Sequence, residues 1–160
     1  MIFASLGTMN MPFVRMARAI DEFASTPNER VIVQTGYTDY HYQYAQAFKF
    51  CTKDEMQRYI NEADIVILQG GWGAISEAME KRKRIVVMPR YNKTEHIHDQ
   101  FQLVRKLDEL GCIIGVFDEN DFASSVEKAR TFEFQQIKRG NAELIIREAL
   151  DKWFYPHKMI

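Results

Sequence analysis

The sequence predicts an α/β fold: a single Rossmann-like domain whose parallel sheet carries helices on both faces. Short β-rich runs alternate with segments of helical periodicity along the chain, as parallel strands joined by helical crossovers require. Two of the runs, 64–68 and 84–88, are almost continuously apolar. Strands buried on both faces have this composition, whereas half-exposed strands alternate.

Apolar spacing places the individual elements. The strands expected in chain order are 2–6, 31–35, 47–51, 65–69, 85–88 and 113–117. The expected helices are 13–23, 54–60, 74–80, 97–110 and a closing helix over about 142–154. Thr52 is the expected N-cap of the second helix.

Composition limits the class of protein. At 160 residues, with 46% hydrophobic and 27% charged residues, the chain fits one globular domain over 1–160. A net charge of -1 argues against a nucleic-acid surface. The basic run 81–84 is expected to be a solvated turn, with a phosphate or lipid-headgroup contact as the alternative. The N-terminus does not resemble a signal peptide and no apolar run reaches membrane-spanning length, so a cytoplasmic protein is expected.

Ligands of such sheets bind beyond the carboxyl ends of the strands. After the fourth strand, glycines lead directly into a helix, whose first N–H groups and dipole form an anion site. The N–H groups of Gly71 and Gly73 are the expected donors, and Glu77 is placed to accept hydrogen bonds from ribose hydroxyls. A structural glycine turn with an ordinary first-turn acid is the alternative. The substrate-binding candidates here are Gly70, Gly71, Trp72, Gly73, Ser76 and Glu77.

Other strand ends supply further candidates. Gly7 and Thr8 follow the first strand as a second phosphate-facing turn, and Gln34 and Thr35 end the second strand with an amide and a hydroxyl. At each place a purely structural turn is the alternative.

The segment after the fifth strand concentrates polar groups at the start of a long helix: Arg90, Glu95, His96, Asp99 and Gln100. Asp99 and Gln100 are expected in the first turns of that helix, within reach of sugar hydroxyls. His96 and His98, two residues apart, are expected on different helix faces, so no shared metal is predicted. His96 is the candidate general base of this chain.

For several other residues, a structural role is the favoured interpretation. Cys51 and Cys112 lack metal-ligand or redox spacing and are expected to be reduced, buried thiols. The tyrosine-rich segment 37–44 is open to two interpretations, a substrate groove or a surface facing a partner. The apolar tail 153–156 is expected to pack on its own sheet, with a partner or membrane contact as the alternative. His41 and His157 are interpreted as surface or packing residues.

Taken in order, these segments resemble the C-terminal, donor-binding domain of family 28 glycosyltransferases. The resemblance extends from residue 2 to about residue 128. It looks closest to stand-alone subunits of split enzymes, namely PssE-like subunits of bacterial polysaccharide synthesis and the catalytic subunit of the eukaryotic UDP-GlcNAc transferase of N-glycan assembly. The segments that carry it are Leu6-Gly7-Thr8, Met11-Pro12-Phe13, Val33-Gln34-Thr35-Gly36, Ala63-Asp64-Ile65-Val66-Ile67, Gly70-Gly71-x-Gly73-x-Ile75-x-Glu77-Ala78, Val86-Val87-Met88-Pro89-Arg90, Glu95-His96, Asp99-Gln100 and Leu110-Gly111.

The resemblance implies half of a GT-B fold and a hexosyltransferase that transfers sugar from a UDP-sugar to a lipid-linked acceptor with inversion. It implies neither metal nor cofactor. The glycine turn would meet the diphosphate, Glu77 the ribose, and Asp99 with Gln100 the donor sugar. A membrane-anchored partner subunit would bind the acceptor and recruit this chain to the inner face of the membrane for polysaccharide or glycolipid synthesis, and the chain alone would be inactive. This partner, in preference to His96, would supply the general base.

Two positions depart from the family pattern. Trp72 stands where the family commonly has alanine, and Gln69 where it often has His or Ser. The indole could stack on a sugar or uracil, change the donor preference, or block the pocket. The alternative hypothesis is therefore a non-catalytic interaction protein whose donor pocket is blocked by Trp72. A response-regulator or flavodoxin-like domain is a third possibility, which lacks support because neither an acidic pocket nor a flavin-type phosphate loop follows the first strand.

Overall fold

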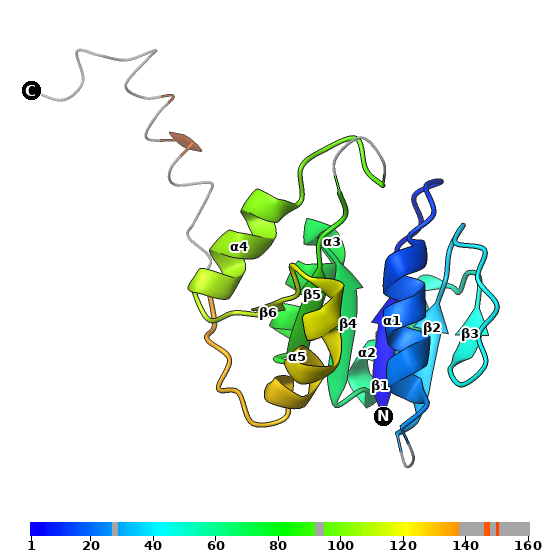
Figure 1. The fold of residues 1–160 in the computed structure, drawn as a ribbon. Helices are drawn as coiled ribbons and strands as arrows, with labels where there is room; N and C mark the ends of the chain where they lie inside the picture. The colour runs from blue at the N-terminus through cyan, green and yellow to red at the C-terminus, as the bar shows by residue number, and fades with distance from the viewer. Residues whose placement is uncertain (27–28, 92–94, 138–145, 148–149, 151–160) are drawn as a thin grey trace, which may run out of the picture.

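The computed structural model describes residues 1–26, 29–91, 95–137, 146–147 and 150. They form one six-stranded sheet, in which every pair of neighbouring strands is parallel, in the order β3-β2-β1-β4-β5-β6 (Figure 1). The strands are β1 (Ile2–Ser5), β2 (Val31–Gln34), β3 (Gln46–Phe48), β4 (Ile65–Gln69), β5 (Arg84–Met88) and β6 (Ile114–Gly115). The helices are α1 (Val14–Ala24), α2 (Lys53–Glu62), α3 (Trp72–Glu80), α4 (Phe101–Glu109), the 3-10 turn η1 (Glu119–Asp121) and α5 (Phe122–Ala129). The predicted fold class is confirmed.

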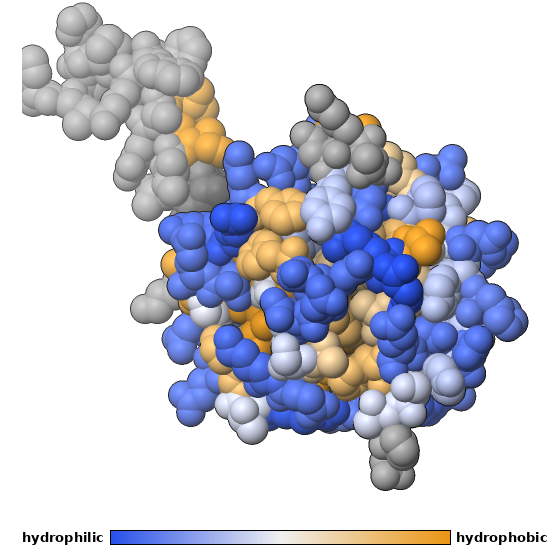
Figure 2. Space-filling model, in the orientation of Figure 1, coloured by the Kyte–Doolittle hydropathy of each residue, from blue (hydrophilic) through white to orange (hydrophobic). Residues whose placement is uncertain are grey.

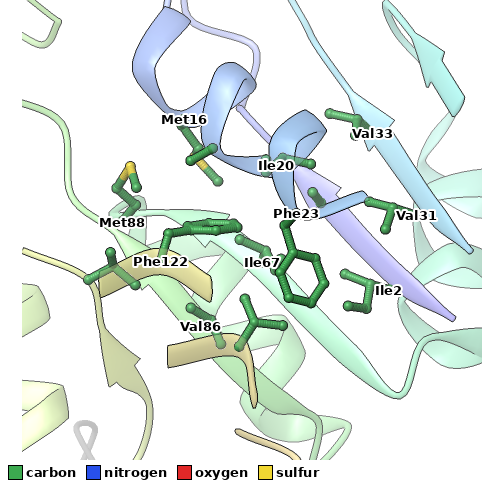
Figure 3. Close-up of a cluster of buried hydrophobic side chains, with 14 of the residues drawn as sticks. Ile2, Met16, Ile20, Phe23, Val31, Val33, Ile67, Val86, Met88 and Phe122 are labelled. Carbon is green, nitrogen blue, oxygen red and sulfur yellow. The ribbon is translucent and has the colours of Figure 1, made fainter. Parts of the chain in front are cut away.

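Each face of the sheet has its own apolar core. Side chains of α1 and α5, among them Ile20 and Phe122, pack on one face together with Ile2 and Ile67 (Figure 3). Phe3 and Val66 point to the opposite face and pack with buried residues of α2, α3 and α4. Alternate residues of β1 and β4 therefore serve different cores, which is why these strands are apolar throughout.

The strand order reverses beside β1. The chain runs outward from β1 to β2 and β3, then returns to the other side of β1 as β4. In open α/β sheets, such a reversal is where ligands bind, outside the carboxyl ends of the two central strands. Here the loops that follow these strands carry Gly7 after β1 and Gly70 after β4, at the upper edge of the sheet in Figure 1.

Some element boundaries differ from the prediction. Helix α4 begins at Phe101, four residues later than expected, because local side-chain bonds hold the preceding segment outside the helix. In particular, Asp99 Oδ1 accepts the Phe101 N–H at 2.8 Å. Helix α3 begins two residues early, at Trp72, and β3 and β6 are shorter than expected. The expected helix over 142–154, the tail 153–156 and His157 lie outside the described residues.

Thr52 caps α2 as expected, in a reciprocal capping box with Glu55.

Two further predictions are partly corrected. Lys83, in the basic turn, is not simply solvated, because its Nζ donates to the carbonyls of Asn61 and Ala63 at 2.6 and 2.9 Å, at the C-terminal end of α2. Both cysteines are free thiols; Cys112 is buried as predicted, but Cys51 is only half-buried.

In the part of the chain that the structure describes, no helix is long and apolar enough to cross a membrane.

A buried carboxylate holds the segment that leads into β3. Asp21 of α1 accepts the main-chain N–H groups of Gln43, Tyr44 and Ala45, each at 2.9 Å. Burial alone would raise the pKa of Asp21, but these three donors outweigh it and lower the pKa below its ordinary value of 3.8. The ionised side chain therefore stabilises the fold, and this contribution is complete above the unfolded-state pKa and is lost as the pH falls through the folded-state value.

We predict that Asp21→Asn lowers the free energy of unfolding by about 1–3 kcal/mol at neutral pH, since an amide cannot accept all three N–H groups. The deficit relative to the unsubstituted chain should shrink as the pH falls through the folded-state pKa of Asp21, which lies below the ordinary value of 3.8. Urea denaturation at neutral pH and near pH 3 measures both effects, with Glu22→Gln, the exposed neighbour, as control. An equal deficit at both pH values would contradict this account.

Candidate functional site

The turn after β4 presents unpaired main-chain donors. Gly71 is the N-cap of α3, and no side chain caps this helix. The N–H groups of Trp72, Gly73 and Ala74 precede the first intrahelical bond, from Ile75 N to Gly71 O, and therefore have no acceptor within the helix. Together with the positive end of the helix dipole they form an anion site. One expectation is corrected: the Gly71 N–H is taken by the Gln69 carbonyl at 2.8 Å, so Trp72 and Ala74 join Gly73 as donors.

The two outer glycines of this turn have different roles. A β-carbon on Gly70 would lie 2.8 Å from Cβ and Oε1 of Gln100, so this glycine lets the two loops approach. A β-carbon on Gly73 would meet no atom within 4 Å. Gly73 therefore faces open space at the helix start, where a ligand can approach the backbone.

Glu77 carries an unsatisfied oxygen. Its Oε1 is buried and has no hydrogen-bond partner among the described residues. Buried carboxylate oxygens are normally hydrogen-bonded, since desolvation without compensation is unfavourable. One turn after the free N–H groups, Glu77 is thus placed to accept a hydrogen bond from a ligand.

Gln100 does not occupy the predicted position. It precedes α4, is only 5% exposed, and its Oε1 accepts the N–H groups of Gly70 and Arg90 at 3.0 and 2.9 Å. Its Nε2 donates to Oε1 of Gln69 at 2.6 Å. Gln100 therefore ties the ends of β4 and β5 together. Asp99 is exposed beside it, so a contact between Asp99 and a sugar stays a prediction.

Arg90, predicted to bind substrate, is 1% exposed and serves the protein's own loops. Its guanidinium donates to the carbonyls of Leu6, Met11 and Glu95 at 2.7, 2.8 and 3.0 Å. It also lies 4.6 Å from the ring centre of Phe13. Burial lowers the pKa of Arg90 to about 10, which leaves it charged at neutral pH. Arg90 therefore holds the loops around the candidate site together.

Glu95 is likewise engaged within the protein. It pairs with Arg15 through two contacts, at 2.9 and 3.1 Å, and accepts the Tyr91 N–H at 2.8 Å. The Arg15 guanidinium lies 4.0 Å from the ring centre of Tyr91. Sequence reasoning missed Arg15, because an arginine in an amphipathic helix gives no sign of a partner eighty residues away.

His96 lies in a loop, not in a helix. Its Nδ1 is 2.9 Å from the His98 N–H donor, and the two rings are 5.8 Å apart, so the expectation that they lie on different helix faces is wrong. Burial lowers the pKa of His96, which is therefore neutral at pH 7, yet Nδ1 is occupied by the His98 N–H. Within the described residues, no three His, Cys, Asp or Glu side chains gather as a metal site.

The ends of β1 and β2 form a tight second turn. Gly36 has φ +57°, and a β-carbon there would lie 2.1 Å from the Gly7 carbonyl oxygen, so only glycine fits. Thr8 is exposed at the rim. Gln34, which accepts the Ser5 hydroxyl, and Thr35 are buried below it, so neither presents an open side chain.

Aromatic side chains of segment 37–44 divide between two environments. Tyr40 and Tyr42 pack against the core. Tyr37 is exposed and stands edge-on to Phe50, with ring centres 5.2 Å apart. Tyr44 is exposed as well, so the two sequence interpretations concern Tyr37, with its neighbour Phe50, and Tyr44.

Trp72 lies at the side of the helix start. It is 49% exposed and borders a shallow hollow of about 190 Å³ with Ser76, Met79 and Ile137. Ser76 donates its hydroxyl to the Gly73 carbonyl at 3.0 Å. Glu77 is five residues from Trp72, about 140° around the helix. The indole and the Glu77 carboxylate therefore leave α3 in different directions.

A larger hollow, of about 930 Å³, lies away from the strand ends, between α1 and α5. Figure 2 shows apolar surface in this region framed by hydrophilic side chains. Two acids at its rim are already paired, Glu119 with Arg18 and Glu127 with Arg130. We therefore place the candidate site at the carboxyl ends of β1 and β4, where free N–H groups and an unsatisfied carboxylate coincide.

A parallel sheet with this strand order, and a glycine turn leading into an uncapped helix at its switch point, defines a Rossmann-like domain, a fold shared with the C-terminal half of GT-B glycosyltransferases. The chain belongs to the glycosyltransferase family 28 C-terminal domains, whose family model matches residues 5–147. No curated protein matches the chain significantly in sequence.

Solved structures show the same fold. The glycosyltransferase of kitacinnamycin superposes with a TM-score of 0.65 at 18% identity, covering 81% of this chain and 34% of that one. ALG13 superposes with a TM-score of 0.59 at 17% identity, covering 92% and 93%. The spinosyn rhamnosyltransferase SpnG, complexed with thymidine diphosphate, gives 0.55 at 18% identity, covering 80% and 36%. The chain thus spans about a third of the first of these proteins and nearly all of ALG13.

We predict that replacing the two outer glycines by alanine has different effects on the free energy of unfolding. Gly70→Ala should lower the free energy of unfolding by about 1–3 kcal/mol, because its methyl group collides with Gln100. Gly73→Ala should leave it unchanged or raise it by up to about 1 kcal/mol, because the space is open and alanine favours the helix. Chemical denaturation of the two variants in parallel measures this difference; a destabilised Gly73→Ala would contradict the open space assigned there.

Proposed function

We propose that this chain is the donor-binding subunit of an inverting glycosyltransferase. It binds a UDP-sugar and, with a partner, transfers the hexosyl group to a lipid-linked acceptor in polysaccharide or glycolipid synthesis. The observation that carries this proposal is the buried, unpartnered Oε1 of Glu77, one turn beyond three free N–H groups. A nucleoside diphosphate supplies phosphate oxygens as acceptors for the N–H groups and ribose hydroxyls as donors to Glu77.

The geometry suits a nucleoside diphosphate in one orientation. Its phosphates accept hydrogen bonds from Trp72, Gly73 and Ala74 N–H, and its ribose hydroxyls donate to Glu77. Developing charge on the departing diphosphate is then stabilised by donors already fixed in place, so this reaction needs no metal or cofactor. SpnG, which shares the fold, was solved with a nucleoside diphosphate.

A partner subunit is needed to complete the reaction. Exposed apolar side chains follow several strands at this edge: Val14, Tyr37, Phe50, Trp72, Tyr91 and Ile97. Apolar surface beside an open site favours a protein partner over solvent. His96, the candidate base of this chain, has its Nδ1 engaged by His98. We assign the acceptor, its base and the membrane anchor to the partner, at the cytoplasmic face.

The second candidate function is a non-catalytic interaction protein with its donor pocket blocked by Trp72. Its support is the exposed indole at the helix start. The contacts of Trp72 favour the donor-binding function instead, since they lie along Ser76 and Met79, on a different side of α3 from Glu77.

Glu77→Gln should weaken UDP binding by about tenfold, because a neutral amide offers one acceptor oxygen where the carboxylate offers two. Isothermal titration calorimetry with UDP measures it, with thymidine diphosphate, GDP and CMP as competing nucleotides. Glu80→Gln, an exposed acid one turn further along α3, is the matched control and should bind as the unsubstituted chain does. Equal UDP affinity in all three proteins would refute the ribose contact.

Trp72→Ala distinguishes the two functions. Donor binding predicts a UDP affinity within about threefold of the unsubstituted chain, because the indole lies outside the Glu77 side of the helix. A blocked pocket predicts that UDP binds only after the indole is removed. Titration of both proteins with UDP therefore decides between a binding subunit and a closed relative.

A further inference from the structure

Two main-chain donors determine how the Gln100 amide is oriented. Oxygen, not nitrogen, must face the N–H groups of Gly70 and Arg90, because only the oxygen accepts hydrogen bonds. The NH2 group of Gln100 then faces Gln69, whose own oxygen must be the acceptor, at 2.6 Å. The orientation of the second amide thus follows from that of the first.

This orientation turns the NH2 group of Gln69 toward the candidate site. Nε2 of Gln69 lies between the turns after β1 and β4: it is 3.3 Å from a β-carbon built on Gly7 and 2.3 Å from one built on Gly71. Gly71 is the N-cap of α3, so this NH2 group adjoins the free N–H groups of the first turn. No hydrogen bond joins Gln69 Nε2 to an acceptor in the described part of the chain.

We infer that Gln69 donates a hydrogen bond to the diphosphate of the donor, and that Gln100 is a positioning residue that fixes the Gln69 amide for this contact. The inference rests on the proposed function and deepens it. It gives Gln100 a role other than the sugar contact expected from the family resemblance, and it assigns a ligand contact to a position where this chain departs from the family pattern. The Gln69 NH2 group adds a side-chain donor to the main-chain donors of α3, and both fit an anion.

Two substitutions separate positioning from simple structural support. In Gln100→Glu the carboxylate still accepts the Gly70 and Arg90 N–H groups but cannot donate to Gln69. The Gln69 amide must then rotate and present its oxygen to the site, where it repels phosphate. Gln69→Met removes the amide at similar length. Each single variant should bind UDP about tenfold or more weakly, with its amide NMR spectrum otherwise retained.

The double variant shows whether Gln100 acts through Gln69. If it does, Gln100→Glu changes UDP affinity by less than about threefold in the Gln69→Met background. A similar loss in both backgrounds, as expected for the added negative charge alone, would overturn the positioning role.

A direct readout is the side-chain NH2 resonance pair of Gln69, identified by its absence in Gln69→Met. Titration with UDP, and separately with inorganic pyrophosphate, should shift this pair together with the amides of Trp72, Gly73 and Ala74. Shifts of the α3 amides without movement of the Gln69 pair would overturn the inference and leave the proposed function standing. Absence of any shift at millimolar UDP would overturn the donor-site proposal, and the role of Gln69 with it.

Discussion

Three carbonyl oxygens from the loops on either side of the site, those of Leu6, Met11 and Glu95, converge on the guanidinium of Arg90. Burying a guanidinium is unfavourable unless its donors are satisfied, and here Nη1 and Nη2 donate to these carbonyls, whereas the buried Nε has no hydrogen-bond partner among the described residues. The same residue gives its main-chain N–H to Gln100, which also accepts the N–H of Gly70. The turns after β1, β4 and β5 are thereby held as one unit, and the uncapped start of α3 is fixed within it.

This unit explains why the site is built largely from the backbone. Gly36 admits the Gly7 carbonyl, and Gly70 admits Gln100, so the loops approach more closely than larger residues would allow. The polar side chains between these loops, those of Arg90 and Gln100, form hydrogen bonds with the loops themselves. In the described part of the site, the groups left without a protein partner are main-chain N–H groups at the start of α3, the NH2 group of Gln69 and the buried Oε1 of Glu77, while Thr8 and Asp99 are exposed beside them. Preorganised donors of this kind stabilise an anion without further rearrangement.

The sequence predicted the sheet well because burial on both faces leaves a strong apolar pattern, as in 65–69 and 84–88. It also located the glycine turn and Glu77, because a strand that runs through glycines directly into a helix is a distinct local pattern; their contact with a ligand stays a prediction. It misplaced the start of α4, where Asp99 and His96 form local side-chain bonds that periodicity does not detect. It also assigned Arg90, Glu95 and Gln100 to ligand contact. Polar residues at strand ends look alike in sequence whether they bind a ligand or a neighbouring loop, and only the distances separate the two.

The proposed function requires that a nucleoside diphosphate binds at the start of α3. A crystal structure of the chain with UDP would show where the nucleotide lies. We expect the diphosphate within hydrogen-bond distance of the Trp72, Gly73 and Ala74 N–H groups, and the ribose hydroxyls on the carboxylate of Glu77. UDP bound elsewhere, for example in the hollow between α1 and α5, with Glu77 unoccupied, would contradict it.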